Sequence, residues 1–261
     1  MRADRSRRDE DREPVRDGSD DPKPGRGQRH RQPAEYYRQR SSAGLIVSEA
    51  IYPSRVAQSF PFTPMLVTDE QTDSWKQVTE AVHAGGSKIF AQLLHGGRVH
   101  SPDSDLTPKA PSAVAAPEQI YTPQGMKDMP VPEAMTEADI EQTVADFVHS
   151  AWKAIEAGFD GVEIHGANDF LVQQFFCAKA NLRTDRWGGS IENRIRFAVT
   201  LVTAVAAAIG PDRTAMRISP ASPLLGIEEV NPEELYPALF DALAPLGLTF
   251  LDIRSGPATV R

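Results

Sequence analysis

Three short apolar runs of the chain end in polar side chains that suit ligand binding. Gln92 follows Phe90-Ala91, His165 closes the run that begins at Gly161, and Arg217 closes a later run. Runs of this length are typical of buried strands, and polar groups at strand ends are the usual anatomy of a barrel active site. A buried amide or guanidinium without a partner is costly, so each of these groups requires either a ligand or a structural partner.

Other polar residues lie close to His165 in the sequence. Asn168 stands three residues after it, and Glu163 stands two residues before it. Residues two apart on a strand point to the same face, so Glu163 and His165 could together ligate a metal ion. No third ligand is spaced to complete such a site. His95 and His100 belong either to the mouth of the site or to an ordinary loop.

Five apolar runs predict strands, and a predicted helix precedes each of them. The strands are expected at 45–47, 88–94, 161–165, 214–219 and 248–253, and the helices at 35–40, 69–84, 137–157, 191–209 and 232–246. Thr68 and Thr136 begin capping boxes, and Ser190 and Asn231 are predicted N-caps. Helices and strands that alternate in this way predict right-handed βαβ units and a parallel sheet, either closed as a barrel or open.

The segment 100–135 interrupts this alternation. It contains prolines at 102, 108, 111, 117, 123, 130 and 132, so neither a helix nor a central strand can run through it. Structureless segments of this length are usually functional lids or disordered. We therefore expect a lid or a disordered loop at this point.

Composition divides the chain into two parts. Residues 1–33 mix Arg, Asp, Pro and Gly with few apolar side chains, which predicts a disordered charged N-terminal tail ahead of one domain at 34–261. The whole chain of 261 residues is 40% hydrophobic, enough for the core of one α/β barrel. Its net charge of −8 comes from residues 34–261, because the tail is slightly basic. An acidic domain of this kind excludes a general nucleic-acid binder.

The cysteine count and the hydropathy indicate a cytoplasmic protein. Cys177 is the single cysteine, so no intramolecular disulfide can form and a reducing compartment fits best. No apolar run approaches the roughly 20 residues of a membrane span. The N-terminus alternates acids and bases where a signal peptide would carry an apolar core.

Several of the polar residues belong to longer motifs that occur in a fixed order. These are Ser48-Glu49-Ala50, Ala91-Gln92-Leu93, His165-Gly-Ala-Asn168, the segment 183–194 with its Arg-Thr-Asp and Gly-Gly-Ser-Ile-Glu-Asn-Arg, and Arg217-Ile-Ser-Pro. The set resembles the Old Yellow Enzyme family of NADH:flavin oxidoreductases over residues 34–261. The resemblance implies a TIM (β/α)8-type barrel. Against that fold the chain supplies about strands two to six, so we expect an incomplete barrel, truncated at both ends.

The resemblance also implies the cofactor and the reaction. FMN would be the cofactor, with NADPH or NADH as reductant. Gln92 would hydrogen-bond the pyrimidine edge of the flavin, Arg217 would face its N1/O2 side, and the backbone of Ala50 would lie against the ring. His165 and Asn168 would donate hydrogen bonds to the carbonyl oxygen of an α,β-unsaturated substrate while hydride reaches its β carbon. The implied function is reduction of the C=C bond of an enone-type small molecule.

Phe170 departs from the pattern of the family. It occupies the position at which most relatives carry a tyrosine that delivers a proton to the α carbon of the substrate. Phenylalanine has no proton to give, so water or another donor must replace the usual general acid. The segments 183–185 and 192–194 are expected to brace the loop that enters the helix after Ser190.

Two other functions remain open from the sequence. Without strands one, seven and eight, the barrel could be a catalytically inactive fragment that does not retain FMN, because the flavin phosphate is held by loops after strands seven and eight. The open barrel edges of such a fragment would invite self-association. The second alternative is a metal-dependent barrel hydrolase that uses Glu163 and His165.

Overall fold

Helices and strands alternate along the chain as predicted. The computed structural model describes residues 31–60, 62–222 and 224–254. The strands are β1 (Leu45–Ile51), β2 (Lys88–Leu93), β7 (Gly161–Gly166), β8 (Thr214–Ile218) and β9 (Leu251–Ile253). The helices that precede them are α1 (Arg31–Arg38), α2 (Asp69–Ala84), α3 (Glu137–Glu156), α5 (Ile191–Ile209) and α6 (Pro232–Leu243). Helix α1 takes in the last residues of the predicted tail at 1–33, whose remainder lies outside the described residues.

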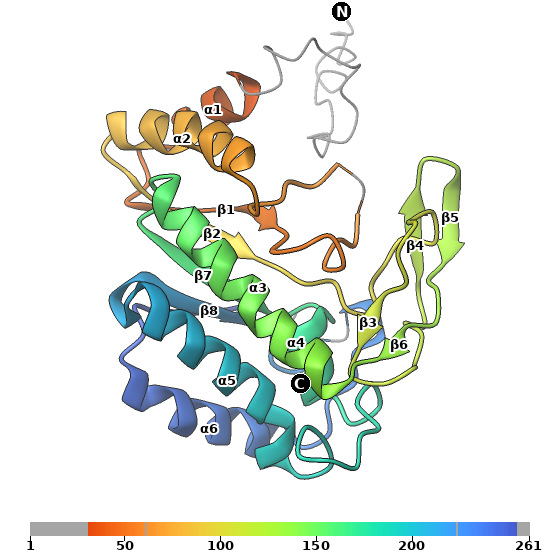
Figure 1. Cartoon of the computed structure of the whole chain (residues 1–261). Helices are drawn as coiled ribbons and strands as arrows, with labels where there is room; N and C mark the ends of the chain where they lie inside the picture. Colours follow the sequence, from red (N-terminus) through yellow and green to blue (C-terminus); the bar gives the residue numbers. More distant parts are fainter. Residues whose placement is uncertain (1–30, 61, 223, 255–261) are drawn as a thin grey trace, which may run out of the picture.

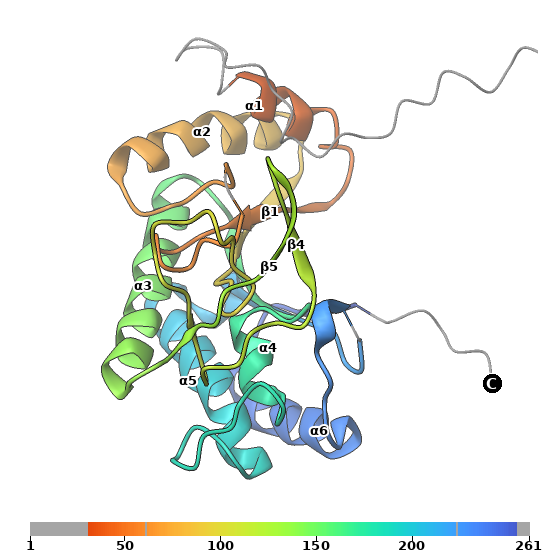
Figure 2. The same ribbon diagram turned by 90° about the vertical axis from the view of Figure 1, so that its right-hand side faces the viewer.

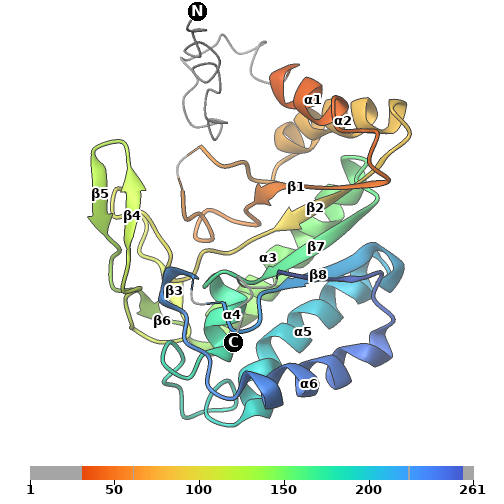
Figure 3. The same cartoon turned by 180° about the vertical axis from the view of Figure 1, so that it is seen from behind.

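The five strands form one parallel sheet in the order β1-β2-β7-β8-β9. The strands of this sheet lie side by side in their order along the chain, because a helix connects each strand to the next. The short strands β3–β6, which lie between β2 and β7 in the chain, are not part of it. Figure 1 shows β1, β2, β7 and β8 in this order with α3, α5 and α6 beside them, and Figure 3 shows these strands from the opposite side. Within the described residues β1 and β9 each pair on one side only, so the sheet is open.

Successive side chains of each strand point to opposite faces of the sheet, which places apolar side chains on one face and polar side chains on the other. Ile164 of β7 belongs to the main core cluster together with side chains of α3 and α5. The strand register pairs Gln92 with Glu163 and His165 with Arg217. Because residues two apart share a face of a strand, these four polar side chains lie on the face that is turned away from the helices.

Capping side chains begin three of the helices as predicted. Thr68 and Thr136 each form a capping box, and Ser190 accepts a hydrogen bond from the Asn193 backbone at 3.3 Å. Asn231 occupies the N-cap position of α6 as predicted, but its φ is 58° and its side chain makes no capping bond. The proline at the first helical position and two acidic residues in the first turn are the remaining start signals of α6.

The two longest helices cover the centre of the sheet. Helix α3 has 20 residues and α5 has 19, and each buries a phenylalanine completely, Phe147 in α3 and Phe197 in α5. Both helices keep a polar side. In the part of the chain that the structure describes, neither these nor any other helix has the length and apolar character to cross a membrane.

The segment 100–135 forms short strands outside the main sheet. β4 (Gln119–Thr122) and β5 (Gly125–Asp128) pair as an antiparallel hairpin, and β3 (Lys109–Ala110) pairs with β6 (Glu133–Ala134) in parallel. The hairpin projects from the body in Figure 1 and faces the viewer in Figure 2. The prediction that no helix or central strand runs here is confirmed. The expectation of a disordered loop is wrong, because the hairpin satisfies its own backbone hydrogen bonds.

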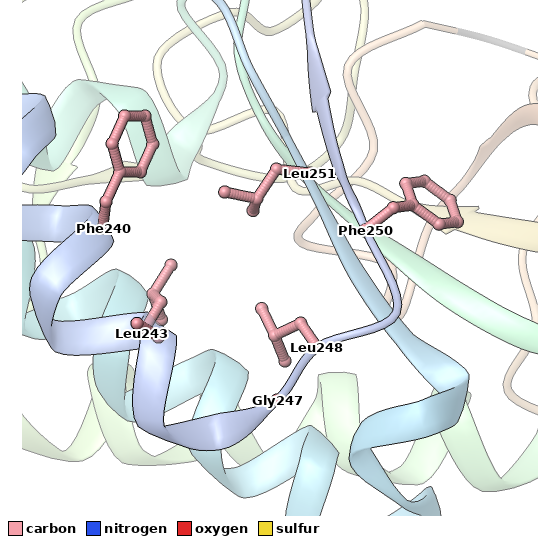
Figure 4. Close-up of a pocket in the computed structure, with 7 residues that line it drawn as sticks. Phe240, Leu243, Gly247, Leu248, Phe250 and Leu251 are labelled. Atoms are coloured by element: carbon pink, nitrogen blue, oxygen red, sulfur yellow. The ribbon is translucent and has the colours of Figure 1, made fainter.

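A hollow of about 260 Å³ lies between α6 and β9, at one open edge of the sheet. Phe240 and Leu243 of α6, Leu248 in the loop before β9 and Leu251 at the start of β9 surround it (Figure 4). Leu251 and Ile253 are 37% and 55% exposed. Within the described residues β9 therefore combines apolar side chains with a backbone that pairs on the β8 side only.

The short helix α4 (Leu171–Phe176) provides a test of the core. Phe175 stacks on Phe197 with ring centroids 4.3 Å apart, and both rings are fully buried. Phe175→Ala leaves a cavity between α4 and α5, so the free energy of unfolding should fall by about 3–5 kcal/mol, as measured by urea unfolding. Trp152→Ala, at an exposed position of α3, is the control and should change it by less than about 0.5 kcal/mol. Equal effects of the two variants would contradict the stacked core.

Candidate active site

Five polar side chains from four neighbouring strands meet on one face of the sheet: Gln92, Glu163, His165, Arg217 and Asp252. We call this set the polar face. Gln92 Nε2 donates to Glu163 Oε1 at 2.7 Å, and Arg217 Nη1 lies 3.4 Å from Asp252 Oδ2. Glu163 Oε2 and Arg217 Nε are buried and have no hydrogen-bond partner among the described residues. Because buried polar atoms normally have partners, the polar face suits a ligand with hydrogen-bonding groups along its edge.

Burial determines the charge of the two polar groups on β7. Desolvation raises the pKa of Glu163, although the hydrogen bond from Gln92 and the charge of Arg217 oppose this effect. Desolvation, together with the positive charge of Arg217, lowers the pKa of His165 to about 3. His165 is therefore a neutral imidazole near pH 7.

A backbone contact decides which nitrogen of His165 carries the proton. The N–H of Ala167 donates to His165 Nδ1 at 3.3 Å. A neutral imidazole has one acceptor and one donor nitrogen, so the proton is on Nε2. Phe170 packs edge-on against the imidazole with ring centroids 5.0 Å apart, and this contact helps to hold the orientation of the ring.

Asn168 presents its amide nitrogen beside the same imidazole nitrogen. Asn168 Oδ1 accepts a hydrogen bond from Arg254 Nη1 at 3.1 Å, so Nδ2 is the amide atom that faces His165. Asn168 Nδ2 and His165 Nε2 lie 3.4 Å apart, and both carry N–H groups. Two donors cannot hydrogen-bond each other, so the pair suits an oxygen acceptor that binds both. We call these two N–H groups the donor pair.

Phe170 and Ala50 lie together beside the sheet. Phe170 is buried in a small apolar cluster with Tyr52 and Leu94, and Ala50 packs against that cluster. Ala50 is also the register partner of Gln92 across β1 and β2. The structure thus brings Phe170 against His165 and Ala50 beside Gln92, so the six residues singled out in the sequence gather at one end of the sheet.

Comparison with protein-family models matches residues 22–234 to the NADH:flavin oxidoreductase / NADH oxidase family. The chain belongs to this family. The NADP-dependent oxidoreductase lnbE of Aspergillus flavus is 41% identical over 234 residues, which cover 87% of this chain. The 12-oxophytodienoate reductase 1 of Oryza sativa subsp. japonica is 43% identical over 190 residues, which cover 72% of this chain.

Solved structures of the NADH:flavin oxidoreductases share the fold. The old yellow enzyme homologue from Zymomonas mobilis matches with a TM-score of 0.84 and 40% identity over 86% of this chain, and morphinone reductase with 0.81 and 41% over 85%. This chain spans 59% and 49% of the two curated relatives, and 64% and 62% of the two solved chains. The predicted fold is confirmed: the described residues form an incomplete TIM-type barrel of the old yellow enzyme kind.

Several buried residues around the site were missed by sequence analysis. Arg98 and Asp169 form an ion pair at 2.9 Å with side chains 4% and 0% exposed. Gln173 and Gln174 of α4 donate to backbone carbonyls in the loops after β8 and β2. Two adjacent glutamines in an otherwise apolar helix were the available signal, because buried amides require partners. Arg254, which orients Asn168, gave no signal of its own.

The segments expected to brace the loop before α5 do so. Arg183 pairs with Asp185 and donates to two backbone carbonyls of the 100–135 region. Asn193 donates to the Gly188 carbonyl at 3.0 Å, and Arg194 donates to a carbonyl at the end of α4. These family motifs therefore connect α4, α5 and the hairpin region, and they contribute structure rather than chemistry.

The metal-ligand alternative gains no support from the geometry. In residues 31–60, 62–222 and 224–254, no three His, Cys, Asp or Glu side chains gather in a group that could hold a metal ion. His95 and His100 are both buried, with burial lowering the pKa of each imidazole, so neither lies open at the mouth of the site.

The raised pKa of Asp169 predicts that the stability of the protein depends on pH. Desolvation raises the pKa of this carboxyl to about 7 from an ordinary 3.8, against the attraction of Arg98, and the charge of Glu118 adds to the rise. The folded state therefore holds a proton that the unfolded state has released between about pH 4 and pH 7. Across this window the contribution of Asp169 to the free energy of unfolding should fall by up to about 1.4 kcal/mol per pH unit.

Urea unfolding of the wild type and of Asp169→Asn at several pH values checks this expectation. The side-chain amide of the variant cannot titrate, so the wild type should lose stability relative to Asp169→Asn as the pH rises from about 4.5 to about 7. Asp105→Asn, at an exposed position, is the control and should run parallel to the wild type. If the wild type instead gains stability relative to Asp169→Asn over this range, the attraction of Arg98 outweighs desolvation. The pKa of Asp169 would then be lowered, and the prediction would be wrong.

Proposed function

We propose that this protein is an FMN-dependent ene-reductase that passes hydride from NAD(P)H to the C=C bond of an α,β-unsaturated carbonyl compound. The donor pair carries the proposal, because His165 Nε2 and Asn168 Nδ2 offer two N–H groups 3.4 Å apart to one oxygen atom. Relatives named 12-oxophytodienoate reductase and morphinone reductase give it independent support. The match covers only part of each relative, so the activity of the whole protein is itself part of the proposal.

The polar face fits the ring of FMN. Gln92 keeps its amide oxygen and a second N–H beyond its bond to Glu163, and Arg217 offers a buried Nε without a partner among the described residues. Ala50, beside Gln92 on β1, has a side chain small enough for a ring to approach the backbone. Bound FMN would supply the hydride chemistry, accepting hydride from NADPH or NADH and giving it to the substrate. The charge of Arg217 would favour negative charge at the edge of the ring.

The donor pair would polarise the substrate. His165 and Asn168 hold the carbonyl oxygen and stabilise the negative charge that develops on it as the β carbon is reduced. A neutral imidazole serves this purpose without a competing proton transfer to the oxygen. Two donors also fix the direction of the carbonyl, which one donor alone would leave free to rotate.

Phe170 leaves the second half of the reaction without a side-chain acid. The α carbon must still receive a proton, and the phenyl ring beside His165 has none to give. Water is the donor that we assign to this step. The cost of losing a positioned acid is typically about 10²-fold or more in rate.

The remaining assignments follow from composition and family. We assign residues 34–261 to the FMN-binding oxidoreductase domain and residues 1–33 to a charged tail. The partners are a small enone-type substrate and a nicotinamide cofactor, with no nucleic acid and no membrane, and we place the protein in the cytoplasm. The acidic charge of the domain supports the absence of nucleic-acid binding.

The edge of the sheet at β9 provides a second candidate function to test against the first. Leu251 and Ile253 on β9 and the hollow beside α6 expose apolar surface where a further strand could pair. In this second candidate function the protein self-associates through the edge at β9 and does not retain FMN. Colourless, oligomeric material on size-exclusion chromatography would support it over the first.

Flavin content tests the leading proposal. The purified protein should be yellow, and its flavin absorbance should bleach when NADPH or NADH is added without oxygen. Arg217→Ala removes the cation at the ring edge, so the flavin bound per chain should fall at least about fivefold. Arg213→Ala, at the other end of β8, is the matched control and should keep the wild-type content. Equal flavin content in the two variants would refute the role of Arg217.

Phe170→Tyr tests the proton step. The added hydroxyl would stand beside His165 and supply a positioned acid, so turnover of cyclohex-2-enone should rise by about tenfold or more. Steady-state kinetics at saturating enone, in flavin-loaded protein, measures the change. Phe62→Tyr adds the same hydroxyl at an exposed position and should have no effect. Unchanged turnover in Phe170→Tyr would mean that proton transfer does not limit the rate or that the assigned position is wrong.

A further inference from the structure

The turn after β7 has an uncommon backbone conformation. Asn168 and Asp169 have φ values of 58° and 60°, so two consecutive residues with side chains occupy the left-handed region. A Cβ atom disfavours this region, and such residues persist only where their surroundings hold them. The position of Asn168 Nδ2 in the donor pair depends on this conformation, because the side chain leaves the backbone in a direction that φ and ψ determine.

Arg98, in the loop after β2, contacts this turn through a buried charge. Its guanidinium lies 2.9 Å from Asp169 Oδ2, and its Nε donates to the same oxygen at 3.0 Å. The side chains of Arg98 and Asp169 are 4% and 0% exposed. The pair Arg55–Asp105 has a similar separation of 3.0 Å but is 66% and 76% exposed. Water screens an exposed pair, whereas a buried charge that loses its partner is strongly destabilised.

Other hydrogen bonds hold the backbone of the turn but leave its charge to Arg98. The N–H of Asn168 donates to Ser219 Oγ at 3.0 Å, and the N–H of Asp169 donates to Gln173 Oε1 at 3.0 Å. The carboxyl of Asp169 is the remaining side chain of the turn that requires a partner. Because its pKa is raised to about 7, it forms the ion pair with Arg98 in its ionised form above that pH. Its ion pair therefore connects the conformation of the turn directly to the loop after β2.

We propose that Arg98 and Asp169 are positioning residues for the substrate. Their ion pair keeps the turn left-handed, and so keeps Asn168 Nδ2 beside His165 Nε2. Both residues act through Asn168 and neither touches the substrate. The inference rests on the proposed function for the identity of the bound oxygen, whereas the effect of the pair on the turn is independent of any activity.

Glycine and alanine at position 169 separate the ion pair from the backbone effect. The double variants Arg98→Met/Asp169→Gly and Arg98→Met/Asp169→Ala both lack the ion pair, and neither leaves a buried charge. They differ in the backbone, since glycine adopts a φ of about 60° without strain and alanine does not. If the pair serves to hold the turn, glycine should replace it and alanine should not.

Two measurements at about pH 8, where Asp169 of the wild type is ionised, compare these variants with the wild type. In flavin-loaded protein, kcat/KM for cyclohex-2-enone should fall about tenfold to a hundredfold in the alanine double variant, with a raised KM, and should stay within about threefold of wild type in the glycine double variant. Hydrogen exchange of peptides covering 166–174 should be at least about tenfold faster with alanine than with glycine. Flavin bound per chain should be the same in both, because Gln92 and Arg217 lie on other elements.

Equal kcat/KM and equal exchange in the two double variants would overturn the proposal. Faster exchange spread evenly over the whole chain would also overturn it, since that result means global destabilisation. The control Arg55→Met/Asp105→Ala removes an exposed pair and should match the wild type in every measurement. If the alanine variant does not fold, Arg98→Lys takes its place. It keeps the charge without the fork of the guanidinium, and unchanged exchange at 166–174 in this variant would overturn the proposal.

The proposed function and the proposed role of the Arg98–Asp169 pair can fail separately. A wild-type protein that binds no flavin and reduces no enone would refute the proposed function. The exchange comparison between the glycine and alanine variants needs neither flavin nor substrate. It would still decide whether the Arg98–Asp169 pair holds the turn.

Discussion

β7 is buried on both faces along its entire length, and this constraint governs the chemistry at its end. It is the central strand of the five, so its polar side chains are removed from water and contact the neighbouring strands. Burial opposes the charged form of each group, and it drives both Glu163 and His165 toward their neutral states. The hydrogen-bond donor at His165 Nε2 is therefore a product of burial combined with one backbone contact from Ala167.

Cations surround the neutral imidazole of His165, which itself carries no charge. Arg217 stands one strand away, partly balanced by Asp252, and Arg254 directs one of its N–H groups to Asn168. The arrangement places positive charge close to the donor pair without protonating His165. Such a site interacts more strongly with an oxygen that gains negative charge during a reaction than with a neutral one, which is the requirement for catalysis rather than mere binding.

The framework was predictable because its signals are local. The capping boxes of Thr68 and Thr136 and the apolar run that ends at His165 depend on residues a few positions apart, and the structure contains all of them. A motif of fixed spacing likewise identified His165 and Asn168 as neighbours in space. Asn231 shows the limit of local signals, because it occupies the predicted N-cap position with a left-handed backbone and its side chain makes no capping bond. The pairing of Arg98 with Asp169 left no trace in the sequence, because the partners are 71 residues apart and either charge is equally compatible with a surface loop.

Because the strands are parallel, the residues of the site come from distant parts of the chain and meet late in folding. Gln92 and Glu163, which bond across β2 and β7, are 71 residues apart, so a long loop must close before the contact exists. Sheets built from such distant pairings form slowly. In a chain made from its N-terminus, Arg98 remains hydrated until Asp169 has been synthesised and β7 has joined β2. The turn that positions Asn168 is thus completed late in folding, and the donor pair comes together only when the sheet has assembled.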